Sequence, residues 1–110
     1  MKVYLDDERP TPLGSVAVRW PEEAIRLLET GRIAELSLDH DLGADARGTG
    51  YTAILWLEEA VAVRGFDPPA ITVHTANAAA REKMLLGVQS IHQLAQRPAE
   101  PNAPADGGGE

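Results

Sequence analysis

Short apolar runs alternate with longer amphipathic stretches along the first 97 residues of the chain. Runs of bulky apolar residues typical of short strands lie at residues 3–5, 16–18, 36–39 and 71–74. Stretches with apolar residues at helical spacing cover residues 21–30 and about 51–64, and a third follows Asn77 and reaches Ala95. Strands that alternate with helices predict an α/β domain with a mainly parallel, four-stranded sheet.

Local signals mark the ends of these helices. Pro21 fits a first helical position, and Gly31 fits the position just past the end of the same helix. Gly65 closes the second helix, and Asn77 fits the N-cap of the third. Gly87 lies inside the third helix, where glycine is expected to weaken the helix by about 1 kcal/mol.

The composition changes at Pro98. From there to residue 110 the chain consists of proline, alanine, glycine, asparagine and acidic residues, with no apolar side chain larger than alanine. Such a segment cannot bury enough apolar surface to offset the entropy lost on ordering. We therefore expect one folded domain over residues 1–97 and a disordered tail over residues 98–110.

The chain is acidic, with 17 aspartates and glutamates against 10 lysines and arginines and a net charge of −7. This charge argues against binding to long duplex nucleic acid or to an anionic membrane, but it leaves a metal-bridged or very local phosphate contact open. The absence of cysteine excludes disulfides, cysteine-based zinc sites and thiol nucleophiles. Neither a signal peptide nor an apolar stretch of the roughly 20 residues of a membrane span is visible, so a cytoplasmic protein is expected.

Three of the four predicted strands end in polar or ionisable residues. These clusters are Asp6-Asp7-Glu8, Asp39-His40-Asp41 and His74-Thr75-Ala76-Asn77. The carboxyl ends of parallel strands lie at one edge of the sheet, which is where open α/β sheets bind ligands. Aspartate and asparagine favour turns, so one such cluster alone is better explained as a strand end. Three clusters at the same edge, two of them with a histidine, predict a functional site.

Carboxylates gathered at one edge repel one another, and burying them without compensation is costly. A divalent cation removes this conflict. Asp6, Asp7 and Asp39 are predicted to supply its oxygen ligands, with a further contribution near Asp41. Hard oxygen ligands of this kind suit Mg²⁺ or Mn²⁺.

Four residues are candidates for binding a phosphate. Arg47 and Thr49 belong to the glycine-rich segment 43–51, where backbone N–H groups before a helix can approach a phosphate and Arg47 can add a charge. An exposed loop explains the same glycines equally well. Thr75 and Asn77 lie at the expected start of the last helix, where side-chain donors and the helix dipole favour an anion.

The strand ends resemble those of a receiver domain of two-component signalling. Such domains carry an acidic pair after the first strand, here Asp6 and Asp7, an aspartate after the third, here Asp39, and a threonine or serine after the fourth, here Thr75. The chain departs from this pattern because the fifth strand and its lysine are missing, and Lys83 is a poor substitute. Phosphoacceptor signalling through Asp39 is therefore in doubt.

A closer similarity is to the cyclic-phosphate processing receiver domain family, and it covers Met1 to about Ile91. The motifs that carry it are Val3-Tyr4-Leu5-Asp6-Asp7-Glu8-Arg9-Pro10, Ser37-Leu38-Asp39-His40-Asp41-Leu42-Gly43, Gly48-Thr49-Gly50-Tyr51 and Val73-His74-Thr75-Ala76-Asn77. The resemblance implies a small three-layer, receiver-like (flavodoxin-like) fold that is truncated, and an action on cyclic phosphate ends of RNA or nucleotides.

These observations favour a metal-dependent phosphoesterase that opens a 2′,3′-cyclic phosphate. His40 and His74 are the expected acid and base, since imidazole titrates near neutrality, and both could also join the metal site. The attacking group is either a metal-bound water or Asp39 itself. Two alternatives stay open: a catalytically silent module that binds a metal, a nucleotide or a partner protein, and a phosphoacceptor that uses Asp39. The oligomeric state is open too, since the edge of a four-stranded sheet can pair with a second copy.

Overall fold

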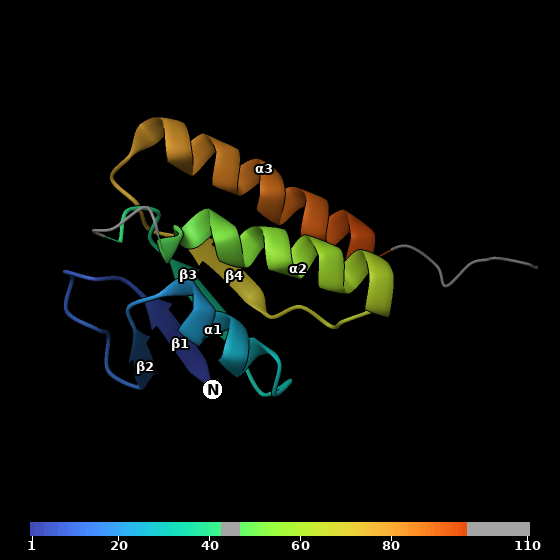
Figure 1. The fold of residues 1–110 in the computed structure, drawn as a ribbon, viewed down its shortest axis with the longest axis horizontal. Coiled ribbons are helices and arrows are strands. Elements are labelled where there is room, and N and C mark those ends of the chain that lie inside the picture. The colour runs from blue at the N-terminus through green and yellow to red at the C-terminus, as the bar shows by residue number, and fades with distance from the viewer. Residues whose placement is uncertain (43–46, 97–110) are drawn as a thin grey trace, which may run out of the picture.

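The computed structural model describes residues 1–42 and 47–96, which form four strands and three helices. In chain order they are β1 (Lys2–Leu5), β2 (Ser15–Val18), α1 (Pro21–Leu28), β3 (Glu35–Leu38), α2 (Gly50–Arg64), β4 (Ala70–Val73) and α3 (Ala78–Ala95) (Figure 1). Every expected strand and helix is present, while the expected tail lies outside the described residues. None of these helices combines the length and the apolar character that crossing a membrane requires.

The four strands form a single parallel sheet in the order β2-β1-β3-β4. In this register Leu5 lies beside Val18 and Leu38, and Leu38 lies beside Val73. Residues paired in a parallel sheet point to the same face, so the apolar residues at alternate positions share one side. The predicted α/β class with a parallel four-stranded sheet is confirmed, and the strand order agrees with a truncated receiver-like, flavodoxin-like fold.

One face of the sheet carries the hydrophobic core. Its strand residues Val3, Leu5, Leu36, Leu38 and Val73 are at most 9% exposed. Each helix adds buried side chains to the same cluster, among them Ala24 and Leu28 of α1, Ile54 and Leu57 of α2, and Met84 and Ile91 of α3. The helices lie side by side, α1 against α2 and α2 against α3. One layer of helices therefore covers one layer of sheet.

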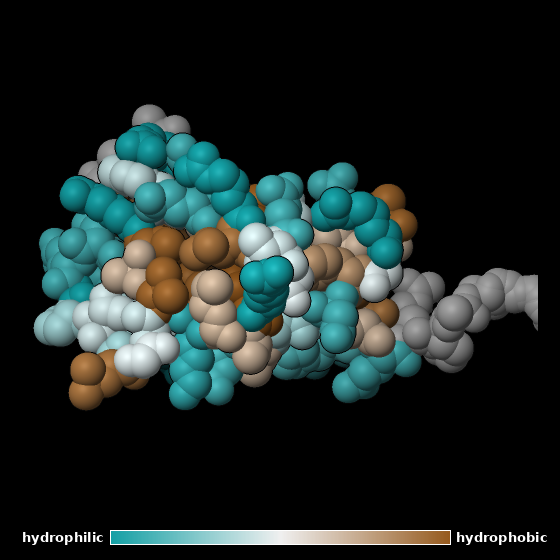
Figure 2. Space-filling view, turned by 90° about the horizontal axis from the view of Figure 1, so that it is seen from below, coloured by the Kyte–Doolittle hydropathy of each residue, from teal (hydrophilic) through white to brown (hydrophobic). Residues whose placement is uncertain are grey.

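The opposite face of the sheet is not covered by a helix in the described part of the chain. Tyr4 and Ser37 on this face are partly exposed, and Ala17 and Thr72 beside them are exposed. This corrects the expected three-layer arrangement, because residues 6–14 link β1 to β2 without a helix. Figure 2 views the molecule from the side on which β2 lies, and it shows apolar side chains gathered at the centre and bordered by polar ones. The side chains of Asp6 and Asp39 continue this face beyond the strand ends, where neighbouring side chains cover them to all but 1% and 12%.

The two longest helices approach each other closely at Gly87 of α3. A Cβ atom at this position would lie 2.5 Å from Cγ2 of Ile54 in α2, which is closer than side chains pack. Glycine therefore permits the contact between the two helices. Gly87 thus lowers the helix propensity of α3, as expected, but allows α3 to pack more closely against α2.

Candidate functional site

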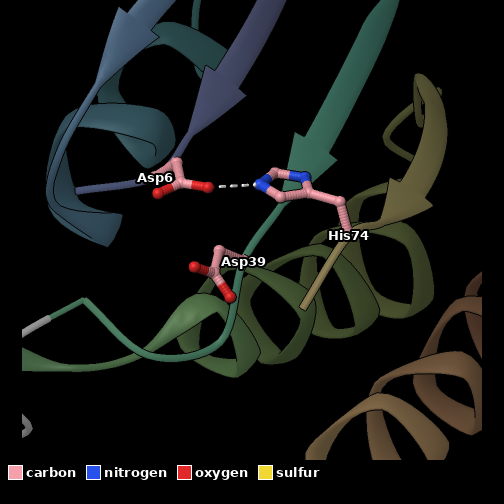
Figure 3. Close-up of side chains that lie close together, drawn as sticks. All are labelled: Asp6, Asp39 and His74. Atoms are coloured by element: carbon pink, nitrogen blue, oxygen red, sulfur yellow. Dashed lines mark hydrogen bonds and ion pairs between the residues drawn. The ribbon is translucent and has the colours of Figure 1, made fainter. Parts of the chain in front are cut away.

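The carboxyl ends of β1, β3 and β4 bring three side chains together, those of Asp6, Asp39 and His74 (Figure 3). Each residue directly follows its strand, and the backbone pairing continues, since the N–H of Asp39 donates to Leu5 and the N–H of His74 donates to Leu38. One ligand atom from each of the three side chains lies within 4.8 Å of the other two. Strand order, and not closeness in the sequence, creates this cluster.

Asp6 is the most enclosed member of the cluster, with a side chain that is 1% exposed. Its Oδ1 accepts hydrogen bonds from the backbone N–H groups of Glu8 (2.8 Å) and Arg9 (3.0 Å), and its Oδ2 lies 2.9 Å from Nε2 of His74. Burial raises the pKa of Asp6, but the hydrogen bonds from Arg9, Glu8 and His74 together lower it below its usual value of 3.8. Asp6 is therefore an ionised, buried carboxylate at neutral pH.

His74 is held at both ring nitrogens and on one ring face. Its Nε2 faces Asp6, and its Nδ1 lies 2.7 Å from the hydroxyl oxygen of Ser37. The imidazole stacks on the ring of Tyr4, with centroids 4.3 Å apart and an angle of 4° between the planes. With Asp6 ionised, the pattern assigns the proton to Nε2, which donates to the carboxylate, while Nδ1 accepts from Ser37. The partners of His74 thus fix both its tautomer and its orientation.

Sequence reasoning missed Ser37 and Tyr4. Both lie on the uncovered face of the sheet, two residues before Asp39 and Asp6 respectively. Side chains alternate along a strand, so residues 4 and 6, and residues 37 and 39, point to the same side. This period of two is the sequence signal that points to Tyr4 and Ser37. It places them beside His74 only when the order of the strands in the sheet is known.

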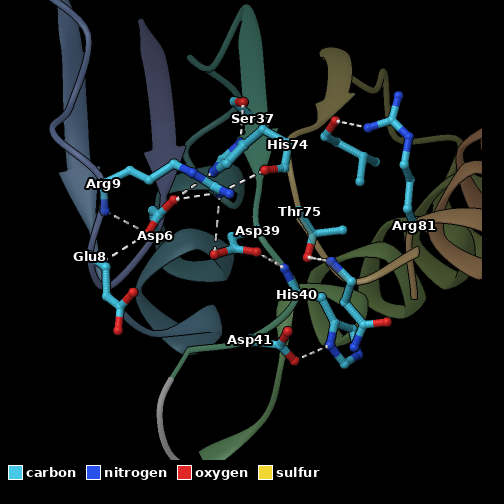
Figure 4. A network of polar contacts seen from close by, with 12 residues as sticks. Asp6, Glu8, Arg9, Ser37, Asp39, His40, Asp41, His74, Thr75 and Arg81 are labelled. Atoms are coloured by element: carbon cyan, nitrogen blue, oxygen red, sulfur yellow. Dashed lines mark hydrogen bonds and ion pairs between the residues drawn. The ribbon is translucent and has the colours of Figure 1, made fainter. Parts of the chain in front are cut away.

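The guanidinium of Arg9 lies between the two aspartates of the cluster (Figure 4). Its Nη1 is 3.3 Å from Oδ2 of Asp6 and 3.6 Å from Oδ2 of Asp39, and it donates a 2.6 Å hydrogen bond to the carbonyl oxygen of His74. Asp39 in addition accepts a 2.7 Å hydrogen bond from the N–H of His40 through Oδ1. Arg9 was not among the predicted site residues, although an arginine directly after an acidic cluster is a visible signal.

An open pocket of about 300 Å³ borders this cluster. Its lining residues are Asp6, Asp7, Glu8, Arg9, Asp39, Asp41, Thr75 and Ala76. Five of these residues carry a carboxylate and one carries a positive charge. Asp7 and Asp41, both predicted as metal ligands, line the pocket but lie outside the group of ligand atoms formed by Asp6, Asp39 and His74.

The two predicted catalytic histidines belong to separate pairs. Nδ1 of His40 lies 2.8 Å from Oδ1 of Asp41, whose side chain is 59% exposed. His74 is paired with the buried carboxylate of Asp6 and belongs to the cluster of ligand atoms, whereas His40 does not. The structure therefore brings one histidine, and not two, to the centre of the site.

Thr75 and Asn77 lie just before α3, as expected. Thr75 is 7% exposed and lines the pocket, and its Oγ1 accepts a hydrogen bond from the N–H of Asn77 at 3.2 Å. Oδ1 of Asn77 accepts a hydrogen bond from the N–H of Ala80 at 3.0 Å, which confirms the predicted N-cap. Of these two predicted phosphate ligands, Thr75 borders the pocket and the side chain of Asn77 caps the helix.

Arg47 and Thr49 make their contacts elsewhere. The guanidinium carbon of Arg47 lies 3.9 Å from the centre of the Trp20 ring, and its Nη2 lies 3.2 Å from a carboxylate oxygen of Glu22. Oγ1 of Thr49 accepts a hydrogen bond from the backbone and caps the start of α2. Residues 43–46 of the same segment lie outside the described residues. The structure therefore places Arg47 in a stacking contact and Thr49 at a helix cap, outside the lining of the pocket, and their contact with a phosphate stays a prediction.

Gly50 brings the start of α2 against the chain at Asp39. A Cβ atom at position 50 would overlap the carbonyl oxygen of Asp39, and the N–H of Gly50 donates to the carbonyl of His40 at 3.1 Å. Only glycine permits so close an approach to backbone. Gly50, one glycine of the predicted phosphate-binding segment 43–51, thus allows the start of α2 to pack against Asp39.

The donor set of the cluster fits a hard divalent cation. Two carboxylate oxygens and an imidazole nitrogen lie within 4.8 Å of one another, and the 2.9 Å between Asp6 and His74 is a spacing that two ligands of one ion can adopt. The open pocket beside them leaves room for waters or a phosphate oxygen to complete the coordination. Asp6 and Asp39 are therefore the residues that can hold such an ion, and His74 can join them only when Nε2 gives up its proton.

Comparison with known proteins relates the chain to one family. Residues 1–90 match the family described as cyclic-phosphate processing receiver domain, and the match includes Asp6, Asp39 and His74. No curated protein and no solved structure matches the chain significantly. Because the family match spans all of the sheet, the first two helices and most of the third, the chain belongs to the cyclic-phosphate processing receiver domain family.

Proposed function

We propose that this domain is a metal-dependent phosphoesterase that opens 2′,3′-cyclic phosphate ends of RNA or nucleotides. Membership of the family supports the substrate class, because the family is described by the processing of cyclic phosphates. The cluster of Asp6, Asp39 and His74 beside an open pocket supports a catalytic role for that site. The pocket is also of a size that admits a phosphate with part of its sugar.

The charge of the pocket is the observation that carries the proposal. Five of its lining residues are carboxylates and Arg9 is the one cation among its described lining residues. Two like charges 4 Å apart repel by about 4 kcal/mol at an effective dielectric constant near 20, so an anionic phosphate does not enter this pocket unaided. A divalent cation held by Asp6 and Asp39 offsets the charges of these two carboxylates and presents a positive centre to the phosphate. We infer Mg²⁺ or Mn²⁺ from the oxygen ligands, with Asp7 and Asp41 as further ligand candidates.

A divalent ion in this place supplies Lewis-acid chemistry, because it polarises a phosphoryl oxygen and lowers the pKa of a bound water. The residues of the chain supply the rest. His74 is the proposed acid–base group, since Asp6 and Ser37 hold its ring in one orientation and such groups contribute about 10² to 10⁴-fold to the rate. Thr75 is the proposed hydrogen-bond donor to the phosphate. His40 is the second acid–base candidate, and Asp41 is its partner.

The attacking group is either a water or Asp39. Attack by Asp39 forms an acyl phosphate on its carboxylate and breaks one ester bond of the cyclic phosphate, whose ribose oxygen takes up a proton; a water must then cleave the acyl–phosphate bond and release the nucleotide monoester. Attack by water gives the monoester directly. The two routes differ in whether the protein gains the mass of the substrate during turnover, which mass spectrometry of rapidly quenched samples detects.

The proposal is tested by incubating the protein with 2′,3′-cyclic nucleotides in Mg²⁺, in Mn²⁺ or in EDTA, and following the phosphorus signal by NMR. We expect conversion to a 2′- or 3′-monoester with metal and no conversion in EDTA. Conversion that continues in EDTA contradicts the metal mechanism. Metal binding without conversion favours the silent binding module instead.

The phosphoacceptor alternative has its own test. The protein is incubated with acetyl phosphate and Mg²⁺, and its mass is measured. A gain of one phosphoryl group that is lost in Asp39→Asn supports this alternative and removes the phosphoesterase proposal if no cyclic nucleotide is converted.

A further inference from the structure

The guanidinium of Arg9 lies against the two carboxylates of the cluster. Its Nη1 contacts Oδ2 of Asp6 and Oδ2 of Asp39. These are the two carboxylates of the group that can hold a metal ion. The side chain of Arg9 is 42% exposed, while those of Asp6 and Asp39 are 1% and 12% exposed. An exposed guanidinium thus covers two carboxylates that are otherwise enclosed.

The backbone and the side chain of Arg9 contact different oxygens of the Asp6 carboxylate. The N–H of Arg9 donates to Oδ1 of Asp6, on the far side of the same carboxylate from Nη1. Within the described residues, all hydrogen bonds and ion pairs of the guanidinium involve Nη1 alone. The remaining N–H groups of its fork make no hydrogen bond within the described residues, and a planar fork of this kind matches two oxygens of a phosphate.

We propose that Arg9 is the built-in counter-cation of the metal site and also its phosphate-binding residue. In the metal-free protein its guanidinium offsets one of the two negative charges of Asp6 and Asp39. A divalent ion held by these two carboxylates would compete with Nη1 for their oxygens and repel the guanidinium, so metal binding would displace it. The displaced group remains tethered at the wall of the pocket and binds the phosphate of the substrate. Both steps rest on the metal site of the proposed function, and the last step rests in addition on its phosphate substrate.

The displacement is tested by titrating Mn²⁺ into the wild type, Arg9→Gln and Arg26→Gln in a calorimeter. Arg26 is an exposed arginine of α1 outside the pocket lining, so its variant loses the same charge elsewhere. If the guanidinium covers the site for about nine-tenths of the time, Arg9→Gln binds Mn²⁺ about tenfold more tightly. Arg26→Gln is expected to stay within about twofold of the wild type. Equal or weaker binding by Arg9→Gln overturns the displacement.

Phosphate binding is tested separately, with inorganic phosphate and the Mg²⁺-loaded proteins. Arg9→Gln is expected to bind phosphate at least about tenfold more weakly than Arg26→Gln, since an arginine–phosphate contact is a charge-assisted hydrogen bond. Equal affinity overturns the role of Arg9 toward phosphate.

A measurement on the wild type covers the case in which Arg9→Gln does not fold. The side-chain Nε–H signal of Arg9 is followed by NMR as Mg²⁺ is added, and we expect it to shift with the same midpoint as Mg²⁺ binding. A signal that stays unchanged at saturation overturns the displacement. None of these experiments uses turnover, so a protein that releases Arg9 but converts no cyclic nucleotide contradicts the proposed function alone.

Discussion

Nε2 of His74 lies 2.9 Å from Oδ2 of Asp6, although 68 positions separate the two residues in the chain. Residue 6 follows β1 and residue 74 follows β4, and β3 with Asp39 lies between these strands in the sheet. The contact therefore spans the carboxyl edge of three strands. It gives the buried carboxylate a partner and orients the imidazole at the same time.

Replacing His74 by alanine is expected to weaken both the fold and the activity. Asp6 loses a hydrogen-bond donor while it stays buried, which costs about 1 to 3 kcal/mol of unfolding free energy. Loss of the proposed acid–base group lowers the turnover of cyclic nucleotide by about 10²-fold or more. His92→Ala is the matched control, because His92 is exposed on α3. Both variants are measured by urea unfolding and by turnover of cyclic nucleotide. If His74→Ala matches His92→Ala in both quantities, this role of His74 is contradicted.

The stability of the domain is expected to fall in acid because of Asp6. Its pKa in the folded protein lies below the usual value of 3.8, so the unfolded chain takes up this proton first as the pH falls. The stabilisation from Asp6 is thus complete above about pH 5 and is lost as the pH falls through the folded-state pKa. One such group changes the unfolding free energy by at most about 1.4 kcal/mol per pH unit.

Urea unfolding of wild type and Asp6→Asn between pH 3 and pH 6 measures this term. The wild type is expected to lose stability more steeply than Asp6→Asn as the pH falls. Asp67→Asn, at an exposed position, should keep the wild-type slope. Parallel curves for wild type and Asp6→Asn would show that Asp6 is not the titrating group.

Gly50→Ala is expected to disturb the site from outside the pocket. The new Cβ would overlap the carbonyl oxygen of Asp39, so α2 or the chain at Asp39 must move. Overpacking of this kind costs about 1 to 3 kcal/mol. We expect weaker Mn²⁺ binding together with lower stability in urea. Wild-type values for both quantities would mean that the approach of α2 does not position Asp39.

Gly87→Ala sets helix propensity against packing. Alanine favours an exposed helix by about 1 kcal/mol over glycine, but here its Cβ would lie 2.5 Å from Cγ2 of Ile54. We expect a net loss of about 1 to 2 kcal/mol in unfolding free energy. Ile54→Ala removes the obstructing atom, so Gly87→Ala should cost less in that background. Gln89→Ala, exposed on the same helix, should change the stability by less than about 0.5 kcal/mol. A stabilising Gly87→Ala would show that propensity dominates.

Much of the fold was predictable because its signals are local. Apolar runs and helical spacing located every strand and helix, and Pro21, Gly65 and Asn77 marked helix ends within one or two residues. The rule that parallel strands end at one edge brought Asp39 and His74 together correctly. The single helical layer was not predicted, since the side on which each helix packs depends on how the chain crosses from strand to strand.

Sequence reasoning named Asp6, Asp39 and His74 as site residues but missed the side chains that surround them. Ser37 and Tyr4 contact His74 because of the order and register of β1, β3 and β4. A local sequence pattern does not predict this register. Arg9 was overlooked because a cation directly after acidic residues has an ordinary explanation as a solvated charge. Arg47 was predicted to contact a phosphate, and in the structure its guanidinium stacks on Trp20. The direction of this side chain depends on tertiary packing, which the local sequence does not show.

The central claim is that side chains from three strand ends form one cation-dependent catalytic site. The most direct test is the turnover of a 2′,3′-cyclic nucleotide in Mn²⁺ by Asp39→Asn beside Asp67→Asn, which changes the net charge equally at an exposed position. We predict that Asp39→Asn lowers turnover by at least about 10²-fold, because metal-assisted charge stabilisation is worth several kcal/mol, and that Asp67→Asn retains the wild-type rate. Equal rates for the two variants would contradict the account.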